Sequence, residues 1–136
     1  MEITTAAAVT DREDEGLVVE LNDQAGNPAF GPDGTTRVTV TVAGTYSKRY
    51  RQAQEANRKW LRKHRGNTDA DLIDRLAKQQ IAACLIAWDG FTQDGKPYPL
   101  TRDNALHVLD VMPWVREQIE NAMTDHEAFF SNESTS

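Results

Sequence analysis

The sequence predicts an α+β fold in which a small N-terminal antiparallel β-meander precedes a bundle of about four α-helices. Apolar residues alternate with polar ones between residues 16 and 44, as they do in strands, and recur at helical spacing after residue 44. The chain has 136 residues, of which 39% are hydrophobic and 26% are charged. This length and composition are typical of one globular domain, which we place at residues 16–130, with a meander at 16–44 and helices at 46–130.

The two ends of the chain carry no sustained apolar period. Residues 1–15 finish in an acidic cluster, and we predict that they form a mobile arm. Residues 131–136 are polar, and we predict that they form a disordered tail.

Two runs within residues 16–44 have strand character. Residues 17–21 are rich in β-formers, and residues 36–42 alternate strictly between apolar and polar side chains. Turn-forming residues flank the short segment 27–30 between them, which completes the predicted meander. The strand face that we expect to be buried carries Val38, Val40 and Val42.

Four segments have helical periodicity. The segment 46–65 spaces its aromatic and apolar residues along one face, and the segment 68–88 does the same after a capping-box-like start. Residues 81–88 are apolar almost all round, so we predict that they end a central helix packed on several sides. Two further helices are predicted to begin at Thr101 and at Pro113.

The loop at residues 89–100 contains two Asp-Gly pairs: Asp89-Gly90 is predicted to stop the central helix and Asp94-Gly95 to form a tight turn. Two such pairs also invite comparison with a calcium-binding loop. A calcium loop of the EF-hand type needs oxygen ligands at positions 3, 5 and 12, where this chain has Phe91, Gln93 and Leu100. Only Gln93 among them carries a side-chain oxygen, and the carboxylate at position 12 is missing. We therefore expect a structural corner between helices, without a metal ion.

Nucleophilic catalysis would require the single cysteine, Cys84, together with His64, His107 or His126. A reactive thiolate needs partial exposure and a positive neighbour, whereas Cys84 lies in the most apolar segment of the chain. We therefore expect a buried cysteine, no enzymatic activity and no cofactor. The lone cysteine and the lack of any signal-like or membrane-spanning apolar run indicate a cytoplasmic protein that does not enter a membrane.

Basic residues gather in one segment, although the net charge of the chain is −6. The segment 47–65 contains a single acidic residue, Glu55, and eight basic ones. The basic residues are Lys48, Arg49, Arg51, Arg58, Lys59, Arg62, Lys63 and Arg65. With Tyr46, Tyr50 and Trp60 interleaved, this helix could contact phosphates and stack on bases. One function that the sequence leaves open is therefore that of a small nucleic-acid-binding regulator using residues 47–65.

We favour a solvated amphipathic helix over a nucleic-acid site. The aromatic residues repeat at the spacing of a core-facing stripe, and the remainder of the chain is acidic and would repel a polyanion. The cations are then expected to meet the acidic surface of the same or a neighbouring subunit. We therefore expect a homo-oligomer and do not expect nucleic acid as a partner.

A series of segments resembles a known family. A strand leads into GTYSKRYRQAQEANRKW, and LAKQQIAACLIAWDGF, DGKPYPLTRDNALHVL and MPWVREQIENAMTDHEAFF follow in that order. The residues that carry the pattern are Trp88, Gly90, Gly95, Pro97, Asn104, Trp114, Phe129 and Phe130. In order and spacing, about residues 38–130 resemble the tail assembly chaperones of siphoviruses, the bacteriophages with long non-contractile tails.

This resemblance implies a non-enzymatic protein that acts during virion morphogenesis in the host bacterial cytoplasm and is absent from the mature virion. It implies the tape measure protein as the client, whose long hydrophobic helices the chaperone binds and keeps soluble. It also implies that the chaperone helps to recruit the tail tube protein.

A client with exposed apolar helices needs apolar grooves between the helices of its partner. The residues that we expect to offer such protein-binding surface are Ile81, Leu85, Trp88, Leu109, Trp114 and Phe129. For each aromatic residue taken alone, packing in the core is the simpler interpretation.

Overall fold

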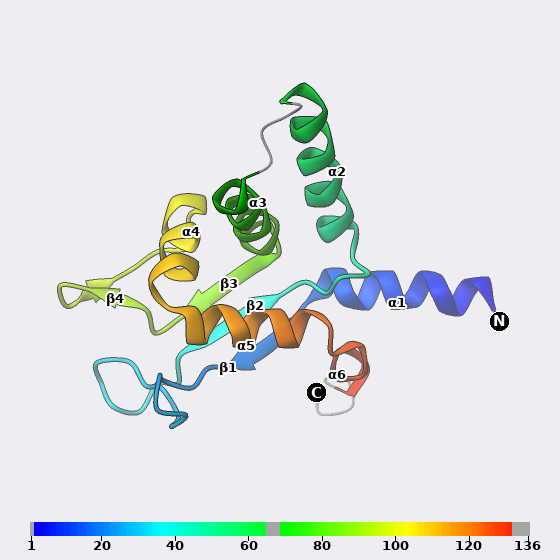
Figure 1. Ribbon diagram of the computed structural model, residues 1–136. Helices are drawn as coiled ribbons and strands as arrows, with labels where there is room; N and C mark the ends of the chain where they lie inside the picture. Colours follow the sequence, from blue (N-terminus) through cyan, green and yellow to red (C-terminus); the bar gives the residue numbers. More distant parts are fainter. Residues whose placement is uncertain (1, 65–68, 132–136) are drawn as a thin grey trace.

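The structure is a computed structural model that describes residues 2–64 and 69–131 (Figure 1). The elements in chain order are α1 (Ile3–Glu15), β1 (Leu17–Glu20), β2 (Thr39–Val42), α2 (Lys48–Lys63), α3 (Ala70–Ala83), β3 (Leu85–Asp89), β4 (Thr92–Gln93), β5 (Lys96–Pro97), α4 (Arg102–Val111), α5 (Pro113–Met123) and α6 (His126–Ser131). Helices and antiparallel strands are combined, as the sequence predicts. The described residues contain six helices rather than four, and the strands β3, β4 and β5 interrupt the helical half.

The main sheet has three strands in the order β1-β2-β3, and both neighbouring pairs are antiparallel. The register places one set of apolar side chains on the same face, namely Leu17, Val19, Val40, Val42, Leu85 and Trp88. Val38, Val40 and Val42 are buried, which confirms the face predicted from their alternation.

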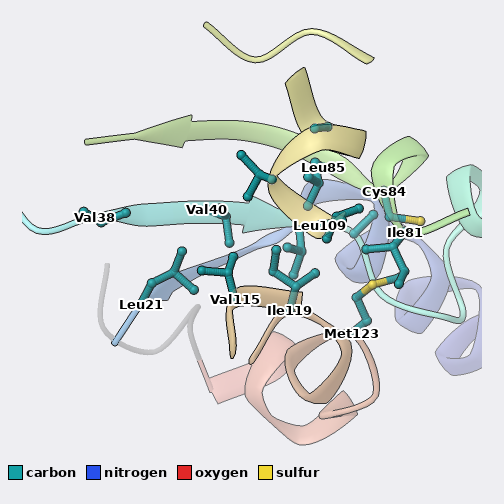
Figure 2. Close-up of a cluster of buried hydrophobic side chains, with 14 of the residues drawn as sticks. Leu21, Val38, Val40, Ile81, Cys84, Leu85, Leu109, Val115, Ile119 and Met123 are labelled. Carbon is teal, nitrogen blue, oxygen red and sulfur yellow. The ribbon is translucent and has the colours of Figure 1, made fainter. Parts of the chain in front are cut away.

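Helices α3, α4 and α5 supply the other half of the core. Val40 and Leu85 from the sheet meet Leu109 of α4 and Ile119 of α5 in one cluster of buried side chains (Figure 2). Each helix thereby buries its apolar stripe against the sheet or against its neighbour.

The predicted helical end at residues 81–88 is wrong. Helix α3 stops at Ala83, Cys84 forms its C-cap, and residues 85–89 form strand β3 beside β2. A short apolar run fits a buried helix and a buried strand equally well, so its periodicity does not decide between them. Pairing with β2 gives the backbone of this run its hydrogen-bond partners.

The predicted meander is also only partly formed. Residues 27–30 make two isolated bridges, Asn22 with Pro28 and Phe30 with Arg37, and no regular strand. Pro28 has no N–H group to donate to a ladder, which keeps this segment a loop. Strand β3, from the second half of the chain, completes the sheet instead.

Residues 3–15, predicted to belong to a mobile arm, form helix α1. Its C-terminal half lies against the start of α2 and against α6, where Glu13 is fully buried. Its N-terminal half extends away from the sheet (Figure 1), and Thr5, Ala6, Ala7 and Ala8 are exposed. At the other end, Ser131 closes α6, and the rest of the predicted tail lies outside the described residues.

Several local predictions of the helical half are confirmed. Thr101 is the N-cap of α4, and its hydroxyl accepts a hydrogen bond from the Asn104 N–H at 3.1 Å. Pro113 is the first residue of α5. Asp94 and Gly95 both have positive φ, 53° and 77°, and form the two-residue turn between β4 and β5.

Candidate functional site

The residues predicted to bind a client lie mainly inside the domain. Ile81, Leu85, Leu109 and Phe129 are all buried, and Trp88 and Trp114 are half-buried against the same core. The structure therefore brings the six together as packing residues. In this conformation the four buried ones expose little surface, and among them Leu85 lines a groove described below.

Trp88, near the end of β3, packs against the loop at residues 90–100 that follows this strand. Its indole Nε1 donates a hydrogen bond to the Tyr98 carbonyl at 2.8 Å, and its ring stacks on the Tyr98 ring and lies tilted against the Phe91 ring. Gly90, at φ 91°, leaves no room for a side chain, because a Cβ would lie 3.0 Å from the Val38 backbone. The loop is thus a structural corner, as its turn residues predict.

The basic residues of α2 are exposed along the helix. Arg58 and Arg62 pair with Glu55 at 3.7 and 3.2 Å, and Arg65 lies outside the described residues. The first turn of α2 is capped by Asp14 of α1, whose carboxylate accepts hydrogen bonds from the N–H groups of Lys48 and Arg49. The acidic cluster of residues 11–15 therefore serves the N-terminus of the basic helix within the same chain.

Helix α2 has 16 residues and none of them is buried. It contacts the body mainly through α3, with an amide link from Asn57 Nδ2 to the Leu76 carbonyl at 3.1 Å. Leu61 remains 37% exposed on it. An amphipathic helix normally buries its apolar stripe, so α2 leaves part of its stripe uncovered.

A groove of about 600 Å³ lies between α2 and α3, and we call it the α2–α3 groove. Strand β3 and the start of α4 complete it. Its lining is Arg49, Ala53, Ala56, Asn57, Trp60, Gln79, Ala82, Ala83, Leu85, Ile86, Leu100, Thr101 and Arg102. Among the residues that the structure describes, the lining is mostly apolar, contains two arginines and contains no carboxylate.

This groove was not predicted from the sequence, because the prediction of client-binding residues rested on large apolar side chains. Of the six residues predicted to bind a client, Leu85 is the member that lines the groove in the described part of the chain. The helical walls are made instead by the small residues Ala53, Ala56, Ala82 and Ala83. The available signal was the pair Ala53 and Ala56 at a spacing of three on the basic helix, which places two small side chains on one face.

A second cluster joins α1, the segment before α2, and α6. The buried Glu13 carboxylate accepts a hydrogen bond from Tyr46 N–H at 3.0 Å and pairs with His126 Nδ1 at 2.6 Å. The other imidazole nitrogen lies 3.5 Å from the Thr45 hydroxyl, and the Tyr46 ring stacks on the imidazole at 3.8 Å.

The order of hydroxyl, imidazole and carboxylate resembles that of a nucleophilic triad, but its surroundings do not support acyl transfer. A triad also needs backbone N–H groups directed at the developing oxyanion. Here Thr45 N–H donates to the Met123 carbonyl and Tyr46 N–H donates to Glu13. The cluster therefore works as a clamp that holds three segments of the chain together.

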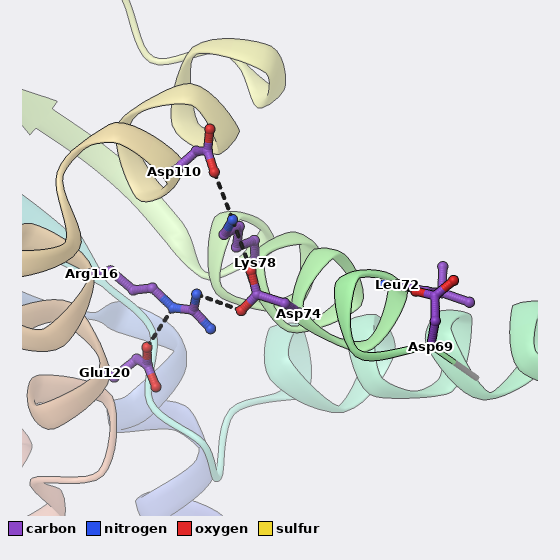
Figure 3. A network of polar contacts seen from close by, with 7 residues as sticks. All are labelled: Asp69, Leu72, Asp74, Lys78, Asp110, Arg116 and Glu120. Carbon is purple, nitrogen blue, oxygen red and sulfur yellow. Dashed lines mark hydrogen bonds and ion pairs between the residues drawn. The ribbon is translucent and has the colours of Figure 1, made fainter.

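Charged side chains also gather on the outer surface of α3, α4 and α5 (Figure 3). Lys78 Nζ lies 2.8 Å from Asp110 and 2.9 Å from Asp74, and Arg116 lies 2.8 Å from Asp74 and 2.7 Å from Glu120. Hydrogen bonds from Lys78, and then from Arg116, lower the pKa of Asp74, and the bond from Lys78 lowers that of Asp110. Because each cation has carboxylate partners, this network is structural rather than a site for a ligand.

The remaining chemical candidate, Cys84, is fully buried. Burial raises the pKa of its thiol to about 12, so the thiolate is scarce at neutral pH. Among residues 2–64 and 69–131, no group of three or more His, Cys, Asp or Glu side chains is placed to hold a metal ion.

Comparison of the chain with protein-family models, with curated proteins and with solved structures finds no match in any of the three. In the part of the chain that the structure describes, no helix is both long and apolar enough to cross a membrane.

Proposed function

We propose that this protein is a tail assembly chaperone of a siphovirus, and that it binds the tape measure protein and keeps it soluble. It acts in the host bacterial cytoplasm during virion morphogenesis, helps to recruit tail tube subunits and is absent from the mature virion. It works by binding and not by catalysis, and it needs no cofactor. The family part of this proposal comes from the order and spacing of the motifs between residues 38 and 130.

The observation that supports a binding function is the α2–α3 groove. It is an open apolar concavity between two helices, and one of these helices buries none of its own residues. Apolar grooves between helices are a common way to bind an amphipathic helix of a partner. The client of a tape measure chaperone is rich in such helices.

The test is co-expression of this chain with the tape measure protein encoded by the same phage genome. We expect the tape measure protein to move from the insoluble to the soluble fraction and to co-purify with the tagged chaperone. An unrelated long coiled-coil protein is the control and should gain no solubility. The proposal is overturned if the tape measure protein stays insoluble and fails to co-purify.

The exposed cations of α2 keep nucleic-acid binding as a second candidate function, because this helix carries seven of them and has no buried residue. A regulator of this kind should bind duplex DNA at physiological salt, with an affinity that falls steeply as salt increases. A chaperone should bind DNA hardly at all under those conditions. Fluorescence anisotropy with a labelled duplex over a salt series separates the two.

A further inference from the structure

We infer that the α2–α3 groove is the client site, and that it takes one amphipathic helix with acidic residues along its flanks. This inference rests on the proposed function and adds the place and the chemistry of recognition. Three features of the groove support it: its walls, the incomplete burial of α2 and the sign of its charge.

The walls of the groove suit a helix. Ala53 and Ala56 on α2 face Ala82 and Ala83 on α3 across the groove. Small side chains let a third helix approach two others closely. The groove volume of about 600 Å³ lies within the range that is usual for ligand-binding pockets. Leu85, Ile86 and Leu100 provide an apolar floor.

The apolar stripe of α2 is left unfinished by the chain itself. Ala53 and Trp60 lie at the spacing of one helix face and both line the groove, yet both are only partly covered. The α2–α3 contact is the main attachment of this helix. A client helix in the groove would cover more of this stripe and so stabilise α2 on binding.

The positive charge of the groove favours a partner helix that carries acidic side chains. Arg49 and Arg102 both line it, and none of the described lining residues is a carboxylate, although the chain as a whole carries a net charge of −6. Further exposed cations of α2 lie beside it. Acidic side chains on the flanks of a client helix would therefore be attracted here and repelled by the rest of the surface.

Overlapping peptides that tile the tape measure protein are the probe, with binding to the immobilised full-length chain as the measurement. We expect the bound peptides to be amphipathic and acidic. Replacing Ala83, an exposed groove residue, by Trp should abolish binding by filling the groove, and the R49E/R102E variant should weaken it by about tenfold. Matched controls on α3 are I73W and R75E, which alter exposed residues outside the groove and should bind as the wild type does.

Circular dichroism first establishes that each variant keeps the wild-type fold. If folded A83W and R49E/R102E variants bind every peptide as well as the wild type, the groove is not the client site, although the proposed function survives. If basic peptides bind as well as acidic ones, the inferred partner chemistry is wrong. If A83W instead changes the oligomeric state by sedimentation, a second copy of this chain occupies the groove and the inference fails. Failure of the co-expression test, in contrast, removes the proposed function itself.

Discussion

Glu13 is the residue on which the N-terminal part of the fold depends. Its fully buried carboxylate binds the Tyr46 N–H and the His126 imidazole, and its own carbonyl accepts a hydrogen bond from Gly44 N–H at 3.1 Å. A buried carboxylate is tolerated only when its oxygens have such partners. The absence of a side chain at Gly44 is what makes room for it, since a Cβ there would overlap Glu13 Oε1.

Replacing Gly44 by Ala should therefore destabilise the protein. The new methyl group would displace the Glu13 carboxylate from its partners, and we expect the free energy of unfolding to fall by about 1–3 kcal/mol. Urea denaturation measures this change. The control is G31A, where a Cβ meets only ordinary contacts at 3.7 Å and where we expect a change within about 0.5 kcal/mol. Equal effects of the two substitutions would contradict this account of Gly44.

Cys84 yields a prediction about pH. Since burial raises the pKa of its thiol to about 12, the folded protein holds this proton at pH values where the unfolded chain releases it. Stability from this group is present below the ordinary thiol pKa of 9.0 and is lost as pH rises from there toward about 12. At about pH 8 the native thiol should not react with a disulfide reagent, whereas the chain in denaturant should react at once. A native reaction rate close to the denatured one would show that Cys84 is accessible.

Among the elements, α1 contributes more than its terminal position suggests. It supplies Glu13 to the clamp and Asp14 to the first turn of α2. The exposed residues Thr5 to Ala8 supply no such contact to the body. The N-terminal boundary of the folded domain therefore lies within α1, and not at residue 16.

Two truncations test this limit. A chain that starts at Val9 should keep nearly the full stability, because residues 5–8, which it lacks, are exposed. A chain that starts at Gly16 should lose roughly 3 kcal/mol or more, since it leaves the Tyr46 N–H and the His126 imidazole without their buried acceptor. Thermal unfolding of the three chains gives the comparison. An unchanged midpoint in the shorter chain would support the mobile arm that the sequence suggested.

The ion network between α3, α4 and α5 predicts a response to acid. The pKa values of Asp74 and Asp110 lie below the ordinary 3.8 in the folded protein, so their contribution is present above 3.8 and is lost as pH falls from there through the lower pKa values of the folded state. The D74N variant should be less stable at neutral pH, and its stability should fall less steeply in acid. Glu117, an exposed carboxylate of α5 outside this network, gives the control E117Q. A wild-type acid slope in D74N would contradict a role for these pairs.

Elements with strong local signals could be predicted from sequence. The alternation around Val40, the cap at Thr101 and the Asp94-Gly95 turn each depend on neighbouring residues, and each lies where expected. Strand β3 could not be predicted, because the choice between helix and strand was made by β2, which lies far away in the sequence. Helix α1 was missed for the same reason, since the partners of Glu13 lie beyond residue 43.

The candidate site was predicted less well than the fold. Size and hydrophobicity identify the residues that a domain buries, and four of the six predicted client residues are buried. A groove, in contrast, forms where small side chains leave space between two neighbouring helices. The sequence of α2 or of α3 taken alone does not reveal such a space. The sequence did reveal the charge of the site, since the basic segment contains Arg49 and is exposed on α2.

For the molecule as a whole, the separation of charge is the dominant surface feature. Seven exposed cations gather on α2, at one side of the helical layer (Figure 1), while the chain carries 21 acidic residues against 15 basic ones. Copies of such a molecule attract one another when the basic side of one meets the acidic surface of the next. The homo-oligomer expected from the sequence would then depend on electrostatics.

We therefore predict that the oligomer dissociates as salt is raised. Sedimentation velocity from about 0.05 M to about 0.5 M NaCl should show a shift toward the monomer, because salt screens exposed charges beyond roughly 10 Å or less. Replacing Arg58 and Lys59, both exposed, by Gln should weaken association at low salt. An oligomer that persists unchanged over this range would have to be held by apolar contacts instead.

The β4–β5 hairpin has a practical consequence. Its tip, Asp94-Gly95, is exposed and points away from both α1 and α2 in Figure 1. A short affinity epitope inserted there should be accepted without disturbing either end of the chain or the groove. Immobilisation through this tip would present the basic helix to solution, in one orientation, for every binding measurement.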